Sequence, residues 1–291
     1  MWILFTLMAA FAQSWRNALQ SKLSREVNAI GVTLARFIWA GPLAGLYLFG
    51  LYQWQPQPVP DFTPGFWQFV VGAGLMQILA TALMVKLFQL QNFAIGAGLA
   101  KSEALVAAVL GTLFFGTGIS AMGWGGVLLG TVAIFMLSSV KGWRQLSLST
   151  VMLGLACGSC FALTSLWVRE ASLVLNVPFP HRAAWVLLSV ILLQTIILLL
   201  YLGWRDRHTL TQLFKYSRLT WLISISSCIG SIGWFSAMAL EPVPYVKTLG
   251  QVEVFFTLLI SGLWLKDKIT LKEVFGLLLI AIAGVMVMWG K

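Results

Sequence analysis

The sequence predicts an all-α membrane protein, and three observations support this fold class. Of the 291 residues, 59% are hydrophobic and only 10% are charged, whereas roughly a quarter are charged in an ordinary soluble domain. Apolar stretches long enough to cross a bilayer, about 20 residues each, follow one another along the chain. The two halves of the chain also resemble each other. Together these observations predict ten transmembrane helices arranged as two inverted five-helix repeats.

A window-by-window reading of hydropathy places the ten spans. Short polar or proline-containing gaps separate them, so most neighbouring helices must be antiparallel hairpins. The clearest loops are 53–64, 176–182 and the charged stretch 205–218, and the two histidines, His181 and His208, fall in loops. The predicted spans cover residues 2–20, 30–51, 65–87, 92–115, 119–139, 149–170, 183–203, 219–240, 243–265 and 271–289.

A shift of 150 residues superimposes the halves of the sequence. Glu103 then falls on Glu253, and residues 126–129 (GVLL) fall on residues 276–279 (GLLL). We therefore expect a first repeat over 1–145 and a second over 146–291, within one integrated membrane domain. An odd number of spans per copy places the copies in opposite orientations, and inverted repeats are typical of alternating-access transporters. Duplication without transport is the alternative interpretation.

Several motifs resemble those of a known family. Residues 251–256 (QVEVFF), followed by 265–270 (LKDKIT) and Gly276, resemble a Glu-Pro-Val-Phe motif, then Gly-Glu-Arg/Lys-Leu, then Gly. Arg36-Phe37 in the second predicted span resembles the Arg-Phe pair of the same family. The chain thus resembles, over essentially its whole length, the EamA-like transporters of the drug/metabolite transporter superfamily. The proline of the family motif is replaced in both halves. The resemblance implies a ten-helix membrane transporter.

Polar side chains inside the predicted spans are the candidate substrate- or ion-binding residues. A charge at the centre of a membrane helix costs roughly 2.5–3.5 kcal/mol on insertion scales, so such residues normally face the bundle interior and mark a functional path. Lys247 and Gln251 lie one helical turn apart on one face of span 9. Arg16 and Lys86 lie near enough to span ends to reach the interface. The candidates are Glu253, Lys247, Gln251, Glu103, Lys101, Arg36 and Gln77.

Two interpretations of the lysines and glutamates stay open. In the first, Lys101 pairs with Glu253 and Lys247 pairs with Glu103, and these ion pairs only orient the helices. In the second, the residues line a central cavity where surplus positive charge binds the anionic group of a substrate and a carboxylate carries a coupling proton. Lys247 has no acidic residue one turn away on its own helix, so the second interpretation treats it as an unpaired cation that contacts the substrate together with Lys101.

The sequence therefore predicts a secondary active transporter, an exporter or exchanger of a small organic metabolite, with an anionic or zwitterionic substrate favoured by the lysines. A flippase for a lipid-linked or amphipathic molecule is the alternative within transport. A membrane-embedded transferase is disfavoured because the longest gaps lack a His/Asp/Glu cluster, and we expect no enzymatic activity, catalytic residue, metal site or cofactor. The net charge of +10 is scattered along short gaps, which argues against nucleic-acid binding.

We expect a monomeric, multi-pass protein of the bacterial inner membrane. Lys and Arg in short loops favour the cytoplasm, and most of these residues lie in gaps on the side of the loop between spans 1 and 2. This charge distribution predicts that both termini are outside. The family resemblance implies the opposite, namely cytoplasmic termini.

Overall fold

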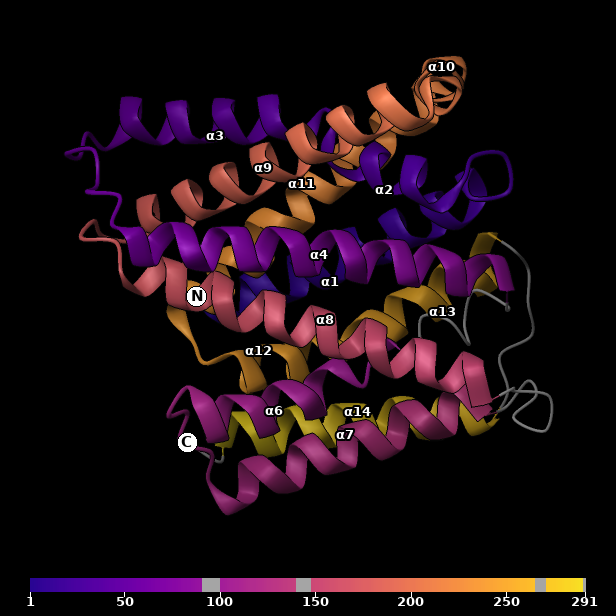
Figure 1. The fold of residues 1–291 in the computed structure, drawn as a ribbon. Coiled ribbons are helices and arrows are strands. Elements are labelled where there is room, and N and C mark those ends of the chain that lie inside the picture. Colours follow the sequence, from indigo (N-terminus) through magenta and orange to yellow (C-terminus); the bar gives the residue numbers. More distant parts are fainter. Residues whose placement is uncertain (91–99, 140–147, 265–270, 290–291) are drawn as a thin grey trace.

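A computed structural model describes residues 1–90, 100–139, 148–264 and 271–289. The predicted all-α fold class is confirmed, since these residues form helices and no strands (Figure 1). The motif at 265–270 lies outside the described residues. The helices are α1 (Trp2–Leu23), α2 (Ala29–Phe37), α3 (Ala40–Trp54), α4 (Pro64–Leu90), α6 (Glu103–Phe114), α7 (Ala121–Ser139), α8 (Leu148–Leu173), α9 (His181–Arg205), α10 (Arg207–Lys215), α11 (Ser217–Leu240), α12 (Val243–Leu249), the 3-10 turn η2 (Gly250–Val252), α13 (Glu253–Trp264) and α14 (Leu271–Trp289).

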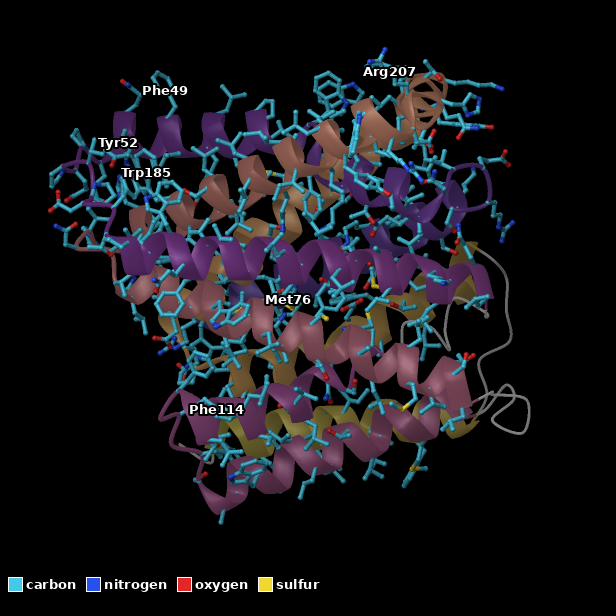
Figure 2. All side chains as sticks on the ribbon, viewed as in Figure 1. Phe49, Tyr52, Met76, Phe114, Trp185 and Arg207 are labelled. Atoms are coloured by element: carbon cyan, nitrogen blue, oxygen red, sulfur yellow. The ribbon has the colours of Figure 1, made fainter. Side chains whose placement is uncertain are left out.

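The helices have the length and composition of a multi-pass membrane protein. In the described part of the chain, six helical segments are long and apolar enough to cross a membrane, and shorter apolar helices lie at 103–114, 121–133 and 278–287. Large apolar side chains are exposed, among them Leu46, Phe49 and Leu200, and Phe49 points outward from α3 (Figure 2). Extensive exposed apolar surface of this kind is what contact with lipid requires.

The second span is interrupted in a way that hydropathy did not predict. α2 ends at Phe37 and α3 begins at Ala40. The hydroxyl of Ser224 on α11 donates to the carbonyl of Ala35 (2.7 Å) and accepts from the amide of Trp39 (3.3 Å). These two backbone groups would otherwise bond to each other, so Ser224 is inserted into the helical ladder, a common cause of helix breaks.

The stretch 205–218, predicted to be a loop, contains the nine-residue helix α10. Asp206 is its N-cap and accepts a hydrogen bond from the backbone amide of Thr209 (3.2 Å), a typical start signal for a helix. The placement of both histidines in loops was therefore wrong. His208 lies on α10, and His181 is the buried first residue of α9.

Helix boundaries and contacts repeat at the offset of 150 residues. α1 ends at Leu23 and α8 at Leu173, while α6 begins at Glu103 and α13 at Glu253. The shift places α1 on α8 and α4 on α11. The two most extensive helix contacts, α4 with α8 and α1 with α11, are therefore equivalent under this shift. Five spans lead from α1 to α8, so these two helices run in opposite directions, and both termini lie at the same end of the bundle (Figure 1).

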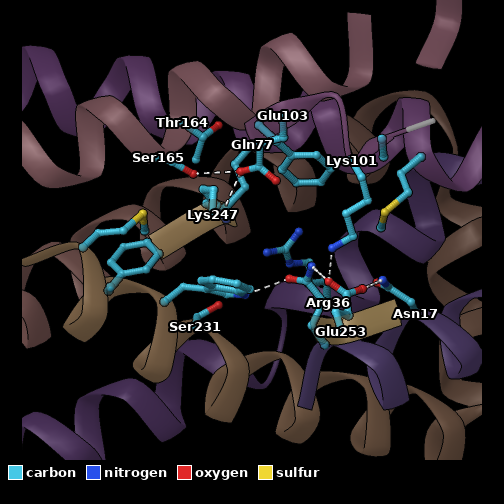
Figure 3. Close-up of a pocket in the computed structure, with 17 residues that line it drawn as sticks. Asn17, Arg36, Gln77, Lys101, Glu103, Thr164, Ser165, Ser231, Lys247 and Glu253 are labelled. Carbon is cyan, nitrogen blue, oxygen red and sulfur yellow. Dashed lines mark hydrogen bonds and ion pairs between the residues drawn. The ribbon is translucent and has the colours of Figure 1, made fainter. Parts of the chain in front are cut away.

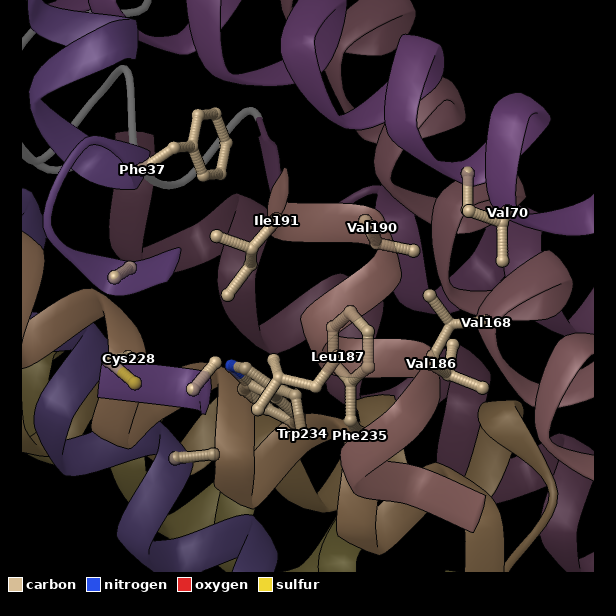
Figure 4. Close-up of a cluster of buried hydrophobic side chains, with 14 of the residues drawn as sticks. Phe37, Val70, Val168, Val186, Leu187, Val190, Ile191, Cys228, Trp234 and Phe235 are labelled. Atoms are coloured by element: carbon tan, nitrogen blue, oxygen red, sulfur yellow. The ribbon is translucent and has the colours of Figure 1, made fainter. Parts of the chain in front are cut away.

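The largest apolar core lies where the two halves meet. Side chains from several helices, among them α2, α4, α8, α9 and α11, form it, and they include Leu187, Ile191 and Phe235 (Figure 4). Small residues allow the helices to approach closely. A Cβ built on Gly233 of α11 would lie 2.7 Å from the carbonyl oxygen of Phe5 on α1, so α1 and α11 pack backbone to backbone, as small residues permit in membranes.

Two glycines on the same face of α11 provide a matched test of this packing. Gly233→Ala forces the backbones of α1 and α11 apart and should cost about 1–3 kcal/mol of stability, as overpacking does. Gly230→Ala should be nearly neutral, because its Cβ would meet α1 at an ordinary 3.6 Å. The melting temperatures of the two purified variants provide the measurement. Equal melting temperatures would contradict the close α1–α11 approach.

Candidate functional site

The ninth span is broken at its middle, and the break places Glu253. α12 ends at Leu249, the 3-10 turn η2 follows, and α13 begins with Glu253. Gly250 permits the break to pack tightly, because a Cβ there would lie 2.4 Å from the ring of Trp234. Discontinuous membrane helices of this kind carry the binding sites of many transporters.

The fourth span presents its carboxylate in the same way. Lys101 and Ser102 form a turn, and α6 begins with Glu103. Glu103 and Glu253 are therefore each the first residue of a helix, although the sequence placed them in the middle of continuous spans. The N-terminus of a helix carries partial positive charge and stabilises an acidic side chain.

Glu253 is held by donors from two other helical segments. It forms an ion pair with Lys101, and its carboxylate accepts hydrogen bonds from Gln13 Nε2 (2.6 Å) and Asn17 Nδ2 (2.9 Å) on α1. Arg16 donates to Asn17 Oδ1 through Nε (3.2 Å) and Nη2 (2.9 Å), which leaves the amide NH2 of Asn17 to face Glu253. The prediction that Arg16 reaches the interface is wrong, because it is only 1% exposed.

Glu103 forms the second ion pair. Its carboxylate lies 2.7 Å from Lys247 Nζ and accepts a hydrogen bond from Ser165 Oγ on α8 (3.0 Å). Lys247 Nζ also lies 4.2 Å from the centre of the Trp234 ring, an attractive cation–π geometry. The description of Lys247 as an unpaired cation was therefore wrong, because its partner is on another helix. Both predicted pairings of lysine with glutamate are present (Figure 3).

The two ion pairs belong to one network. Trp234 Nε1 donates to Gln13 Oε1 (2.8 Å), and Gln13 in turn donates to Glu253. Lys247 lies over the ring of Trp234 and pairs with Glu103, so the network extends from Glu253 to Glu103. Glu253 and Glu103 are thus linked through the amide of Gln13 and the indole ring of Trp234. Neither Gln13 nor Trp234 was among the predicted site residues.

Arg36, like Arg16, has no carboxylate partner among the described residues. It is buried, and its Nε and Nη1 donate to the hydroxyls of Ser227 (3.2 Å) and Thr81 (2.7 Å). No carboxylate of the described residues lies within 4.0 Å of its guanidinium. Gln77 lies nearby and accepts a hydrogen bond from Gln194 Nε2 (2.7 Å).

Six of the seven predicted site residues line one cavity. The space between the lining atoms is about 580 Å³, including the part open toward solvent. Gln251 is the exception: it lines a smaller adjoining space, it is 1% exposed, and neither its amide nitrogen nor its amide oxygen has a hydrogen-bond partner in the described structure. The apolar part of the central wall consists of Met84, Ala100, Phe161, Trp234, Phe235 and Met238.

The cavity has more cations than carboxylates. Among the described residues at and next to it, Arg16, Arg36, Lys101 and Lys247 carry four positive charges, and Glu103 and Glu253 carry two negative charges. The difference of two positive charges is buried in apolar surroundings, where an uncompensated charge is expensive. An anion entering the cavity would therefore be stabilised.

The ion pairs predict different costs for removing each lysine. Lys247→Met leaves Glu103 with a single donor, Ser165, and should destabilise the protein by about 3–5 kcal/mol, as expected for a broken buried pair. Adding Glu103→Gln should restore most of this loss. Lys101→Met should cost less, because Glu253 keeps the donors Gln13 and Asn17. Thermal unfolding of the purified variants measures these differences, and equal costs for the two lysines would contradict the assigned partners.

Comparison with known proteins agrees with this geometry. Residues 148–289, which include α12, η2 and α13, match the EamA-like transporter family. One solved structure, titled only as the crystal structure of a protein, is 15% identical; the match covers 98% of this chain and 96% of that chain with a TM-score of 0.70, which shows a shared fold. None of the curated proteins matches the chain. The resemblance to the EamA-like transporters of the drug/metabolite transporter superfamily is thereby confirmed for residues 148–289, the second half of the chain, which match this family of membrane transporters.

Proposed function

We propose that the protein is a secondary active transporter that exports or exchanges a small organic metabolite by alternating access. The observation that carries the proposal is the position of the central cavity. It is lined from both halves of the chain, and its ion pairs join a carboxylate of one half to a lysine of the other at the start of α6 and of α13. Sites at the breaks of repeat-related helices suit transporters in which one unit moves against the other.

In this proposal residues 1–145 and 146–291 are two inverted repeats. The equivalent ends of α1 and α8, the equivalent starts of α6 and α13, and the equivalence of the α1–α11 and α4–α8 contacts support it. The charge distribution favours termini outside the cell, and the proposed location is the bacterial inner membrane. The proposed working unit is a monomer, whose two halves together line the cavity.

The substrate of the proposed transporter is an organic anion or zwitterion. The two surplus positive charges need a negative partner, and Arg36 directs its guanidinium toward the cavity between the two ion pairs (Figure 3). A planar guanidinium binds carboxylates through paired hydrogen bonds. Phe161, Phe235 and Met238 offer an apolar wall for the rest of the molecule. The role proposed from sequence for Lys247 and Lys101 thus passes to Arg36, since both lysines are already paired.

A coupling proton would be carried by Glu253. Three donors converge on its carboxylate, namely Lys101, Gln13 and Asn17. Movement of α1 against α13 would separate Gln13 and Asn17 from Glu253. A flippase would use a lateral opening for a lipid chain, whereas charged, amide and hydroxyl residues together make up most of the lining of this cavity.

A thermal-shift screen with small organic anions tests the substrate class. A bound ligand stabilises by mass action, by about 2.7 kcal/mol at one hundred times its Kd. We expect carboxylates or amino acids to raise the melting temperature, and Arg36→Gln to weaken their binding about ten- to one-hundredfold, the effect of losing a charged hydrogen bond. Lys86→Gln, which removes an exposed cation from α4, is the matched control and should bind normally. Unchanged affinity in Arg36→Gln would contradict the proposal.

The proposed proton coupling is tested with pair-neutral variants. Glu253→Gln alone would strand Lys101, so Glu253→Gln is combined with Lys101→Met and compared with Glu103→Gln combined with Lys247→Met. In proteoliposomes loaded with a ligand from the screen, the first double variant should lose the pH dependence of transport, and the second should keep it. Glu253 is preferred because it matches the family motif. A normal pH profile in the first double variant would make Glu253 a structural residue.

A further inference from the structure

The helix α10 lies at one end of the bundle, between the end of α9 and the start of α11 (Figure 1). Thr209 and Leu213 are buried against the neighbouring helices α9, α11 and α2. Arg207, His208 and Lys215 are exposed on the other side. The helix therefore has a fixed inner face and a free outer face.

Hydrogen bonds to the preceding half of the chain hold α10 in place. Asn28 Nδ2 donates to Asp206 Oδ2 (3.0 Å) and to Thr209 Oγ1 (2.7 Å), and Thr209 Oγ1 donates to Asp206 Oδ2 (2.6 Å). The hydroxyl of Tyr216 donates to Glu26 (3.0 Å). The bonds from Thr209 lower the pKa of Asp206, so this carboxylate stays ionised and committed to the helix cap.

The same end of the bundle carries a dense set of cations. Between residues 22 and 28 and between residues 204 and 218 there are six Lys and Arg and two acidic residues, a difference of four positive charges. Both acidic residues, Glu26 and Asp206, are already engaged. None of the six cations forms an ion pair with a carboxylate among the described residues, and all six are exposed. They form the α10 basic surface: Lys22, Arg25, Arg205, Arg207, Lys215 and Arg218.

Exposed aromatic rings place this surface at the depth of lipid headgroups. Trp204, in the last turn of α9, is 88% exposed, and Phe214 on α10 is 65% exposed. Trp221, in the first turns of α11, stacks on Trp39 at 4.4 Å between ring centres. Tryptophan at the ends of membrane helices marks the interface between hydrocarbon and water. The cations therefore lie where phospholipid phosphates lie.

We infer that the α10 basic surface binds the headgroups of anionic phospholipids and anchors α10 to the leaflet at this end of the protein. Clusters of Lys and Arg next to membrane helices are attracted to anionic lipids, and arginine binds phosphate through paired hydrogen bonds. An acidic protein segment or a nucleic acid would complement the positive charges of this surface. Neither of them would account for exposed aromatic rings at the depth of the lipid headgroups. The inference does not depend on the transported substrate.

The test compares anionic with neutral lipid on the full-length protein in detergent micelles. Phosphatidylglycerol should raise the melting temperature more than phosphatidylcholine at equal concentration, and high salt should reduce the difference by screening. The neutralised variant Arg205→Gln/Arg207→Gln/Lys215→Gln should lose at least about half of the phosphatidylglycerol effect, since each cation contributes separately. The charge-keeping variant Arg205→Lys/Arg207→Lys/Lys215→Arg should retain most of it.

Two further arms separate the possible ligands. Inorganic phosphate at the same concentration should not reproduce the effect, and neither should poly-glutamate or RNA without lipid. Full stabilisation by phosphate would indicate a free-anion site, and full stabilisation by either polymer would indicate a macromolecular partner. Each of these results, or an undiminished phosphatidylglycerol effect in the neutralised variant, would overturn the inference.

Discussion

Charges buried in an apolar bundle must find partners, and in this protein the partners come from the other half of the chain. Glu253 of the second half pairs with Lys101 of the first, and Glu103 of the first half pairs with Lys247 of the second. Because a lone buried charge costs several kcal/mol, the two halves cannot separate without breaking both pairs or replacing them. The cavity exists where these crossed pairs meet, and the breaks before α6 and α13 bring the carboxylates there.

The same contacts suggest how two arrangements of the bundle could have similar energies. Each carboxylate is bound from two sides, by a lysine and by neutral donors such as Gln13 or Ser165. Sliding one half against the other could exchange neutral donors while keeping the charge pairs. The unsatisfied amide of Gln251, buried beside the network, is a group that such a rearrangement could supply with a partner. Buried polar groups without partners are costly, so their presence fits an alternative packing in which they are bonded.

Much of the fold followed from the sequence because membrane spans are local features. Hydropathy located most of the membrane-sized helices, and the 150-residue offset paired Glu103 with Glu253, the residues that begin α6 and α13. The breaks were missed, since they depend on contacts between distant residues. Ser224 interrupts the second span although it lies 185 residues away in sequence from Trp39. No pattern in the sequence around the second span indicates this break. The helix α10 was missed because its nine residues are shorter than a membrane-sized window.

The site was predicted mainly through its charged residues, because charge inside a span is a strong signal. Five charged candidates and the neutral Gln77 line the cavity, whereas the neutral Gln13, Asn17 and Trp234 were missed. Gln13 and Asn17 lie four residues apart on one face of α1, a spacing that could have identified them. Trp234 could not have been distinguished from the many tryptophans at the membrane interface. The pairing of Lys247 required the fold, since Glu103 lies far away in sequence.

The central claim is that the surplus positive charge at Arg36 binds the negative group of a transported molecule. Anomalous diffraction from crystals soaked with a bromine-bearing organic carboxylate would test it most directly, because bromine locates the molecule independently of the protein density. We expect bromine in the central cavity, with the carboxylate hydrogen-bonded to Arg36 and both lysine–glutamate pairs in place or exchanged. A carboxylate bound elsewhere on the protein, or bound in the cavity with its charge directed away from Arg36, would show that Arg36 does not bind the substrate.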